Sequence, residues 1–169
     1  MARYHYLGYT PLPGAQLRYV IEADNHRVGA LGVSAAAWKV APRDRWIGWS
    51  IPQREQRLAL VVNNSRFLLF PWIQIRYLAS SVLGLLARQL PIDWAARYGY
   101  RSVLLETFVE RNRFAGTSYR AANWIEVGDT QGRGKLDRHH RHAEPVKSIW
   151  VYPLNKRYRA VLTAPLDDD

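Results

Sequence analysis

Apolar residues recur along the chain with two different periods, one typical of β-strands and one typical of α-helices. Residues 17–23 alternate apolar and polar side chains, 24–26 have turn composition, and 28–33 resume an apolar run with small residues. Together they predict a β-hairpin. Other apolar runs predict further strands at 45–50, 66–70, 102–109, 125–127 and 148–152.

Between these strands the apolar residues return every three or four positions, which is the spacing of one helix face. Pro52 marks the start of the first such segment, and Pro91 interrupts the longest, because proline fits a first turn but breaks a helix interior. Helices are predicted at 53–62, 77–89, 94–98 and 113–122. Strands alternating with helices predict an α/β fold, with helices on the faces of a mixed sheet.

The length of 169 residues suits one domain, and no internal repeat or linker divides it. We therefore expect a single domain over residues 1–169, with a basic, histidine-rich loop around 129–145 and a flexible C-terminal tail from about 160.

The chain contains no cysteine, which excludes disulfides, thiolate nucleophiles and cysteine-based zinc sites. The first residues lack the apolar stretch of a signal peptide, and no apolar run approaches the roughly 20 residues needed to cross a bilayer. We expect a cytoplasmic protein with no membrane partner.

Basic residues outnumber acidic ones by 24 to 14, which gives a formal charge of +10 and favours polyanions as partners, nucleic acid first among them. The alternative is a solubilising charge spread over all faces. The candidate nucleic-acid-binding residues lie in the densest basic stretch: Arg133, Lys135, Arg138 and Arg141. His139, His140 and His142 share this stretch, but adjacent histidines on an extended chain cannot all face one ion, so we predict no metal site.

Two titratable residues are candidate general bases. Glu106 lies inside an apolar strand, where desolvation would raise its pKa; alternatively it lies at a solvated strand end or pairs with an arginine such as Arg66. His5 could act as a base or as a substrate clamp, although isolated histidines usually do neither. Asp44, between Arg43 and Arg45, is interpreted as part of an exposed ion pair.

A further motif follows the strand at 102–109. Asn112 is followed by Ala115 three residues on, Tyr119 seven on and Trp124 twelve on. This spacing resembles the signature that closes the acyl-CoA site of the GNAT acyltransferase superfamily. The resemblance implies a splayed, mixed sheet flanked by helices, with Asn112 at the cofactor and Tyr119 as the proton donor to the leaving thiolate. The alternative is that the aromatic residues are core.

A second segment is similar to the superfamily's pyrophosphate-binding turn, Arg/Gln-x-x-Gly-x-Gly/Ala, at the start of a helix. The candidate cofactor-binding residues here are Arg76, Leu78, Ala79, Ser80 and Ser81, and the implied cofactor is acetyl-CoA or another acyl-CoA. Ala79 and Ser81 replace the two glycine positions. The N-H groups and dipole of a helix start still favour an anion, but alanine tolerates positive φ poorly.

Six segments resemble the DruA-type domain of the Druantia anti-phage defence systems: 4–8, 42–49, 64–68, 78–80, 104–109 and 119–124. Such domains also resemble proteins encoded beside transposases, so the resemblance implies either a defence or a mobile-element setting, with other defence-system proteins as possible partners. A His-Tyr pair near the start of a GNAT-like fold is more weakly similar to phage Mom-type proteins, which modify adenine in DNA.

Two hypotheses follow for the function. The first is a GNAT-like acyl-CoA-dependent N-acyltransferase acting on nucleic acid or on a nucleic-acid-bound target, with Glu106 or His5 as base and Tyr119 as acid. The second is a non-catalytic GNAT-like module that binds nucleic acid or assists assembly of a defence system. The replaced glycines favour the second, whereas Glu106, Asn112 and Tyr119 favour the first.

Overall fold

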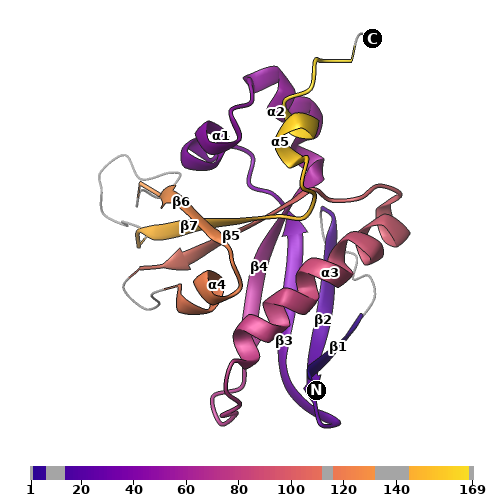
Figure 1. Ribbon diagram of the computed structural model, residues 1–169, viewed down its shortest axis with the longest axis vertical. Helices are drawn as coiled ribbons and strands as arrows, with labels where there is room; N and C mark the ends of the chain where they lie inside the picture. The colour runs from indigo at the N-terminus through magenta and orange to yellow at the C-terminus, as the bar shows by residue number, and fades with distance from the viewer. Residues whose placement is uncertain (1, 7–13, 112–115, 132–144, 168–169) are drawn as a thin grey trace.

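A computed structural model describes residues 14–111, 116–131 and 145–167, and the backbone of residues 2–6 (Figure 1). Its strands are β1 (Ala2–Tyr6), β2 (Gln16–Ala23), β3 (His26–Ala35), β4 (Val61–Leu69), β5 (Leu104–Glu110), β6 (Ile125–Asp129) and β7 (Lys147–Pro153). Its helices are α1 (Ala41–Ile47), α2 (Ile51–Arg57), the 3-10 turn η1 (Leu58–Leu60), α3 (Leu78–Tyr98), α4 (Thr117–Ala121) and α5 (Tyr158–Leu162).

The strands form one seven-stranded mixed sheet in the order β1-β2-β3-β4-β5-β7-β6. Only β4 and β5 pair in parallel; the other neighbouring strands are antiparallel. The predicted α/β class and the predicted hairpin are therefore confirmed. Asp24 and Asn25 turn the hairpin with φ of 50° and 66°, the left-handed conformation that a tight two-residue turn requires.

The central strands β4 and β5 separate soon after they meet. Their register contains three pairs, ending at Asn63 and Glu106, although both strands continue beyond that point. The register of β4 against β3 shifts at the same place: Gly32 pairs with Arg66 and Val33 with Asn64, so Ser65 is the extra residue of a bulge. The bulge turns β4 away from β5, and the predicted splayed sheet is confirmed.

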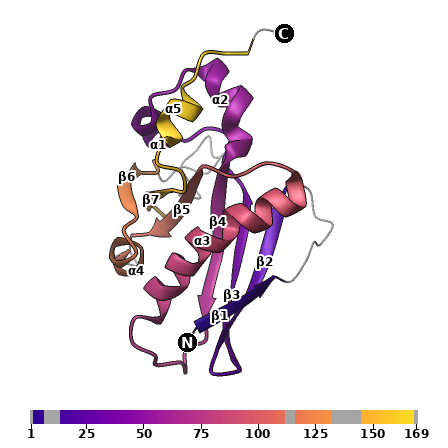
Figure 2. The ribbon, with the colours of Figure 1, turned by 45° about the vertical axis from the view of Figure 1, so that its right-hand side comes forward.

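Helices cover the two faces of the sheet unequally (Figure 2). The long helix α3 lies across one face, where its apolar side packs on β2, β3 and the start of β5. On the opposite face, α1, α2 and α5 gather at one end of the sheet around a smaller cluster that includes Ile47, Leu104 and Leu162. No described helix is long and apolar enough to cross a membrane.

Two predicted elements are wrong in type or extent. The segment 45–50, predicted as a strand, begins with the last three residues of α1, because Pro42 occupies the first turn of that helix and Gly48 ends it in the left-handed conformation, with φ of 82°. The predicted break at Pro91 is also absent, and α3 continues through it. Seven residues of α3 are buried, Pro91 among them, and their packing outweighs the lost backbone hydrogen bond.

The segments before β4 and after β7 also differ from prediction. Helix α2 ends at Arg57, and Val61 and Val62, predicted as helical, instead begin β4. The flexible tail expected from about 160 begins with α5, whose Leu162 is fully buried. The carbonyl groups of residues 163–165 then accept hydrogen bonds from Gln53 and Arg57 of α2.

A buried ion pair joins α1 to the centre of the sheet on the face away from α3. Arg43 Nη1 donates to Glu106 Oε1 at 2.7 Å, and neither side chain is exposed to solvent. Arg43 also donates to the carbonyl oxygen of Ala37 at 2.8 Å. Burial raises the pKa of Glu106, and the adjacent Arg43 charge opposes that rise. The arginine partner is thus Arg43, not Arg66.

Asp44 completes this network and is not the exposed ion pair interpreted from the sequence. It accepts from Arg43 Nε at 3.1 Å, from the Trp49 indole at 2.9 Å and from Arg54 at 3.3 Å. Because Asp44 also accepts from the N–H of Val40, it fixes the start of α1 as well as the arginine.

We expect Glu106→Ala to lower the free energy of unfolding by about 3–5 kcal/mol, because it leaves Arg43 buried with a partner missing. Glu106→Gln keeps the side-chain volume and one oxygen that can accept from Arg43, so it should lower the free energy of unfolding by less. Glu55→Gln, an exposed change of the same chemistry on α2, is the control and should stay within about 0.5 kcal/mol in urea unfolding. An equal effect of Glu106→Ala and the control would contradict this role for the pair.

The pH dependence of stability follows from the raised pKa of Glu106. The folded state holds this proton to higher pH than the unfolded state, whose carboxyl has the ordinary value of 4.5. The stability that the protonated Glu106 carboxyl adds to the folded state is therefore complete below pH 4.5 and is lost as pH rises through the folded-state pKa. We expect the stability difference between the wild type and Glu106→Gln to shrink with rising pH in urea titrations; a difference that grows would contradict it.

Candidate active site

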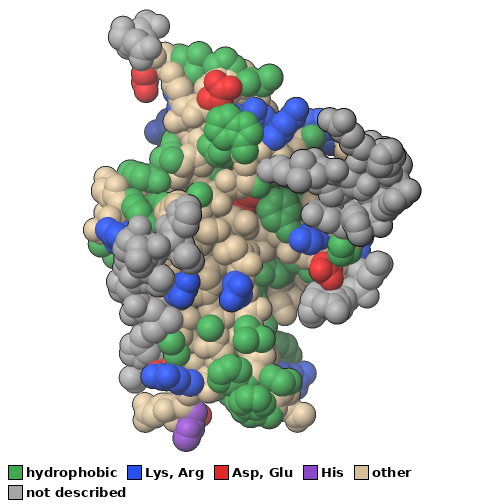
Figure 3. All heavy atoms as spheres, turned by 180° about the vertical axis from the view of Figure 1, so that it is seen from behind, with side chains coloured by type: hydrophobic (Ala, Val, Ile, Leu, Met, Phe, Trp, Pro, Cys, Tyr) green, Lys and Arg blue, Asp and Glu red, His purple; other side chains and the backbone are tan. Residues whose placement is uncertain are grey.

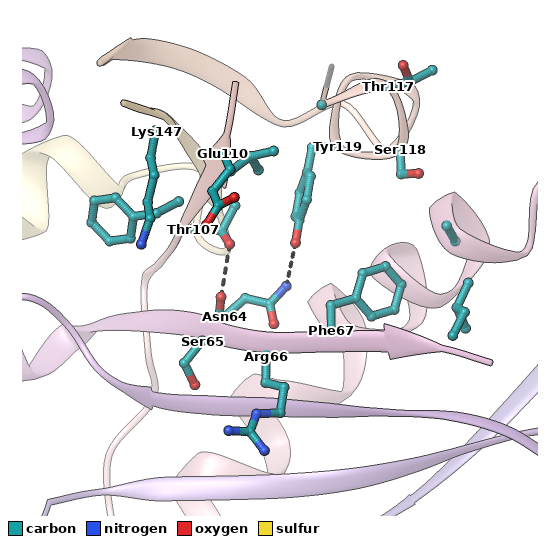
Figure 4. A pocket seen from close by; sticks show the side chains of 15 residues that line it. Asn64, Ser65, Arg66, Phe67, Thr107, Glu110, Thr117, Ser118, Tyr119 and Lys147 are labelled. Carbon is teal, nitrogen blue, oxygen red and sulfur yellow. Dashed lines mark hydrogen bonds between the residues drawn. The ribbon is translucent and has the colours of Figure 1, made fainter. Parts of the chain in front are cut away.

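The separation of β4 and β5 opens a cavity of about 610 Å³ (Figure 4). Strand residues line two of its sides, and the starts of α3 and α4 close it. The lining residues are Asn64, Ser65, Arg66, Phe67, Leu69, Ala79, Thr107, Phe108, Val109, Glu110, Gly116, Thr117, Ser118, Tyr119 and Lys147. The set combines apolar walls with hydroxyl, amide and charged groups, as ligand sites commonly do.

Tyr119 is held over this cavity by aromatic packing beneath α4. Its ring meets Trp124 edge-on, with centroids 5.0 Å apart, and lies 6.5 Å from Trp150 in a stacked arrangement. Gly116 precedes α4 with φ of 70°, and a Cβ there would lie 2.5 Å from the Trp150 ring. Only glycine allows the backbone to approach the indole this closely.

The Tyr119 hydroxyl lies where the two strands separate. It forms a hydrogen bond of 3.0 Å with the Asn64 amide of β4 (Figure 4). Thr107 of β5 donates to the carbonyl oxygen of Asn64 at 2.9 Å, which links the two strands beside this hydroxyl. Burial raises the pKa of Tyr119, and the Thr107 hydroxyl opposes the rise. The phenol is therefore protonated at neutral pH.

Both the nitrogen and the oxygen of the Asn64 side-chain amide have hydrogen-bond partners when the nitrogen points toward the sheet. The nitrogen then donates to the carbonyl oxygens of Arg66 at 3.1 Å and Gly32 at 3.2 Å, and the oxygen accepts from the Tyr119 hydroxyl at 3.0 Å. Sequence reasoning missed Asn64 as a site residue, since it lies between the helix predicted at 53–62 and the strand predicted at 66–70. The available signal was a polar amide directly before an apolar strand, where burial demands a hydrogen-bond partner.

The predicted cofactor-binding segment lies at the start of α3, next to the cavity. Ala79 lines the cavity, Ser80 and Ser81 lie in the first turn, and Leu78 is buried in the core. The left-handed residue of this turn is Tyr77, with φ of 60°. Ala79 and Ser81, at the two glycine positions, are thus helical. The positive φ for which a glycine would be needed lies at Tyr77 instead.

The other sequence-predicted site residues are not brought to this cavity within the described residues. Glu106 is fully buried in its ion pair and does not line the cavity. The backbone of His5 lies in β1, with three strands between it and β5, about 19 Å away at ordinary strand spacing. Asn112 and the basic residues Arg133, Lys135, Arg138 and Arg141 fall outside the described residues.

Solved acetyltransferases share this fold. A chimera of the spermidine N-acetyltransferase SpeG from Vibrio cholerae and hSSAT superposes with a TM-score of 0.52 and 11% identity over 86% of this chain and 70% of that one. Aminoglycoside acetyltransferase AAC(6')-Ib, in complex with coenzyme A and kanamycin, gives a TM-score of 0.51 and 13% identity over 82% of this chain. An N-acetyltransferase from Staphylococcus aureus superposes with a TM-score of 0.52 and 12% identity over 83% of this chain.

These similarities establish a GNAT-type fold. The chain spans 66% of the aminoglycoside enzyme and 68% of the staphylococcal one. Comparison with curated proteins gives no significant match. A family model described as Druantia protein DruA matches residues 1–149, which is most of the chain. The chain therefore belongs to the Druantia DruA family.

Proposed function

We propose that this DruA-family chain is an acyl-CoA-dependent N-acyltransferase of the GNAT type that acts on nucleic acid or on a target bound to it. The observation that carries the proposal is the protonated Tyr119 hydroxyl, fixed at the point where β4 and β5 separate and facing a cavity of about 610 Å³. The net charge of +10 supports a polyanionic target.

The cavity fits the chemistry of an acyl-CoA. Its edge is the start of α3, where first-turn N–H groups and the helix dipole favour a phosphate, and the exposed Arg76 lies just before that turn. The splayed inner edges of β4 and β5 offer unpaired backbone groups to an extended amide-containing chain. Arg76, Ser80, Ser81 and Ala79 would hold the cofactor at this end.

A bound acyl-CoA would supply a thioester whose acyl group passes to an amine, with the sulfur leaving as a thiolate. Tyr119 would give that sulfur its proton, and Asn64, whose backbone carbonyl accepts from Thr107, orients the hydroxyl for the transfer. The amine loses a proton as its nitrogen bonds to the acyl carbon. Among the described residues that line the cavity, Glu110 carries the sole carboxylate and is the candidate acceptor of that proton.

A second candidate function is a non-catalytic module that binds nucleic acid or assists assembly. It is favoured by Ala79, whose methyl group stands in the cavity wall where the superfamily commonly has glycine. The two candidates differ in cofactor binding, because a module without catalysis has no need of acetyl-CoA.

Calorimetric titration with acetyl-CoA tests the proposal directly. We expect saturable binding, weakened about 10- to 100-fold by Arg76→Glu, because a charge-assisted phosphate contact contributes about 1.5–3 kcal/mol. Arg88→Glu makes the same charge change at an exposed position farther along α3 and should bind like the wild type. Absence of binding at millimolar cofactor would instead support the non-catalytic module.

Tyr119→Phe removes the proton donor while keeping the ring against Trp124. We expect kcat for release of the CoA thiol, with a single-stranded oligonucleotide as acceptor, to fall about 10²- to 10⁴-fold while KM for acetyl-CoA changes little. An unchanged kcat in a variant with wild-type thermal stability would exclude the proton-donor role.

A further inference from the structure

No helix of the described residues covers the face opposite α3 over β2, β3 and β4; it is called the open face below. Alternate residues of these strands, beginning at Gln16, Ala30 and Arg66, point away from the α3 core and are exposed or half-buried. Among the helices on this side, α1 contacts β6 and β7. Figure 3 shows this face from behind, with Lys and Arg side chains standing out of an area of backbone and small side chains.

A row of two arginines and a glycine crosses this open face. Arg18 of β2 is the register partner of Gly32 in β3, which is in turn the partner of Arg66 in β4. Both arginines are exposed, and they stand about 10 Å apart because two strand spacings separate them. Gly32, between them, carries no side chain to separate the two arginines.

The row ends where β4 and β5 separate, a point called the fork below. Arg66 and Ser65 line the cavity, and Figure 4 places Arg66 on the side of β4 opposite Tyr119. From β5, Phe108 presents a half-buried aromatic ring to the same cavity. Strand alternation puts Phe108 on the face of Glu106, away from α3. Arg66 and an aromatic ring thus both line the cavity, on the side that the start of α3 does not occupy.

The acidic residues of this face lie opposite basic ones. Glu22 is the register partner of Arg27, and Glu110 that of Lys147. They therefore add no unopposed negative charge beside the arginine row. Guanidinium groups bind phosphates, and an aromatic ring stacks on any base, so this combination fits a nucleic-acid strand.

We propose that the acceptor is single-stranded nucleic acid, which lies across the open face with its phosphates on Arg18 and Arg66 and one base stacked on Phe108 at the mouth of the fork. This inference rests on the proposed function and names its substrate and acceptor surface. We assign a single strand because the amino group of a base within a duplex is paired and stacked, and bringing it to the cavity would cost the energy of unpairing and unstacking.

Fluorescence anisotropy with a labelled single-stranded DNA oligonucleotide tests the surface. We expect Arg18→Ala and Arg66→Ala each to weaken binding and to reduce the slope of log affinity against log salt by about 0.7, the value for one lost phosphate contact. Arg88→Ala, on the opposite face, is the matched control and should leave affinity and slope unchanged. Variants at positions 18 and 66 that behave like this control would overturn the proposal.

Phe108→Leu tests the stacked base, because it keeps apolar volume and removes the aromatic face. We expect affinity to fall about tenfold with no change in the salt slope. Unchanged affinity, or equally tight binding of a duplex of the same sequence, would overturn the single-strand assignment. Acetyl-CoA affinity, measured on Arg18→Ala, should equal that of the wild type. If no variant binds acetyl-CoA but the oligonucleotide results hold, the proposed enzyme fails while the nucleic-acid surface stands.

Discussion

The site depends on one constraint, the end of pairing between β4 and β5 after Asn63 and Glu106. Backbone groups that lose their partners inside a protein must find others, and here side chains supply some of them. The Thr107 hydroxyl donates to the Asn64 carbonyl, and the Asn64 amide satisfies carbonyl groups of β3 and β4. These few hydrogen bonds link the two central strands where their pairing ends, and Asn64 also holds the tyrosine.

The ion pair of Arg43 and Glu106 lies directly behind this point. Glu106 is the last residue of β5 that pairs with β4, so its side chain fixes the apex of the fork from the far face. A buried pair is not in itself a large source of stability, since desolvation offsets much of its attraction. Its effect is positional: α1, through Arg43 and Asp44, is tied to the residue at which the strands separate.

Local periodicity predicted the α/β sheet, whereas the splay and the interest of Tyr119 came from a family resemblance that is carried by the spacing within one segment. Neither predicted contacts between distant segments. Asn64 and Tyr119 lie 55 positions apart, and Arg43 and Glu106 lie 63 apart, so no local pattern pairs them. The error at 45–50 has another cause: Trp46, Ile47 and Trp49 suit a strand as well as a helix, and Pro42 and Gly48 decide between them.

The close approach of Gly116 to Trp150 has a consequence for how α4 behaves. A helix of five residues is too short to be stable by itself, so its order comes from what it rests on. Here that support is an indole anchored in β7 by a hydrogen bond to Ser148. The segment therefore shares the rigidity of the sheet, and the phenol it carries gives up its rotational freedom when the chain folds, before any ligand arrives.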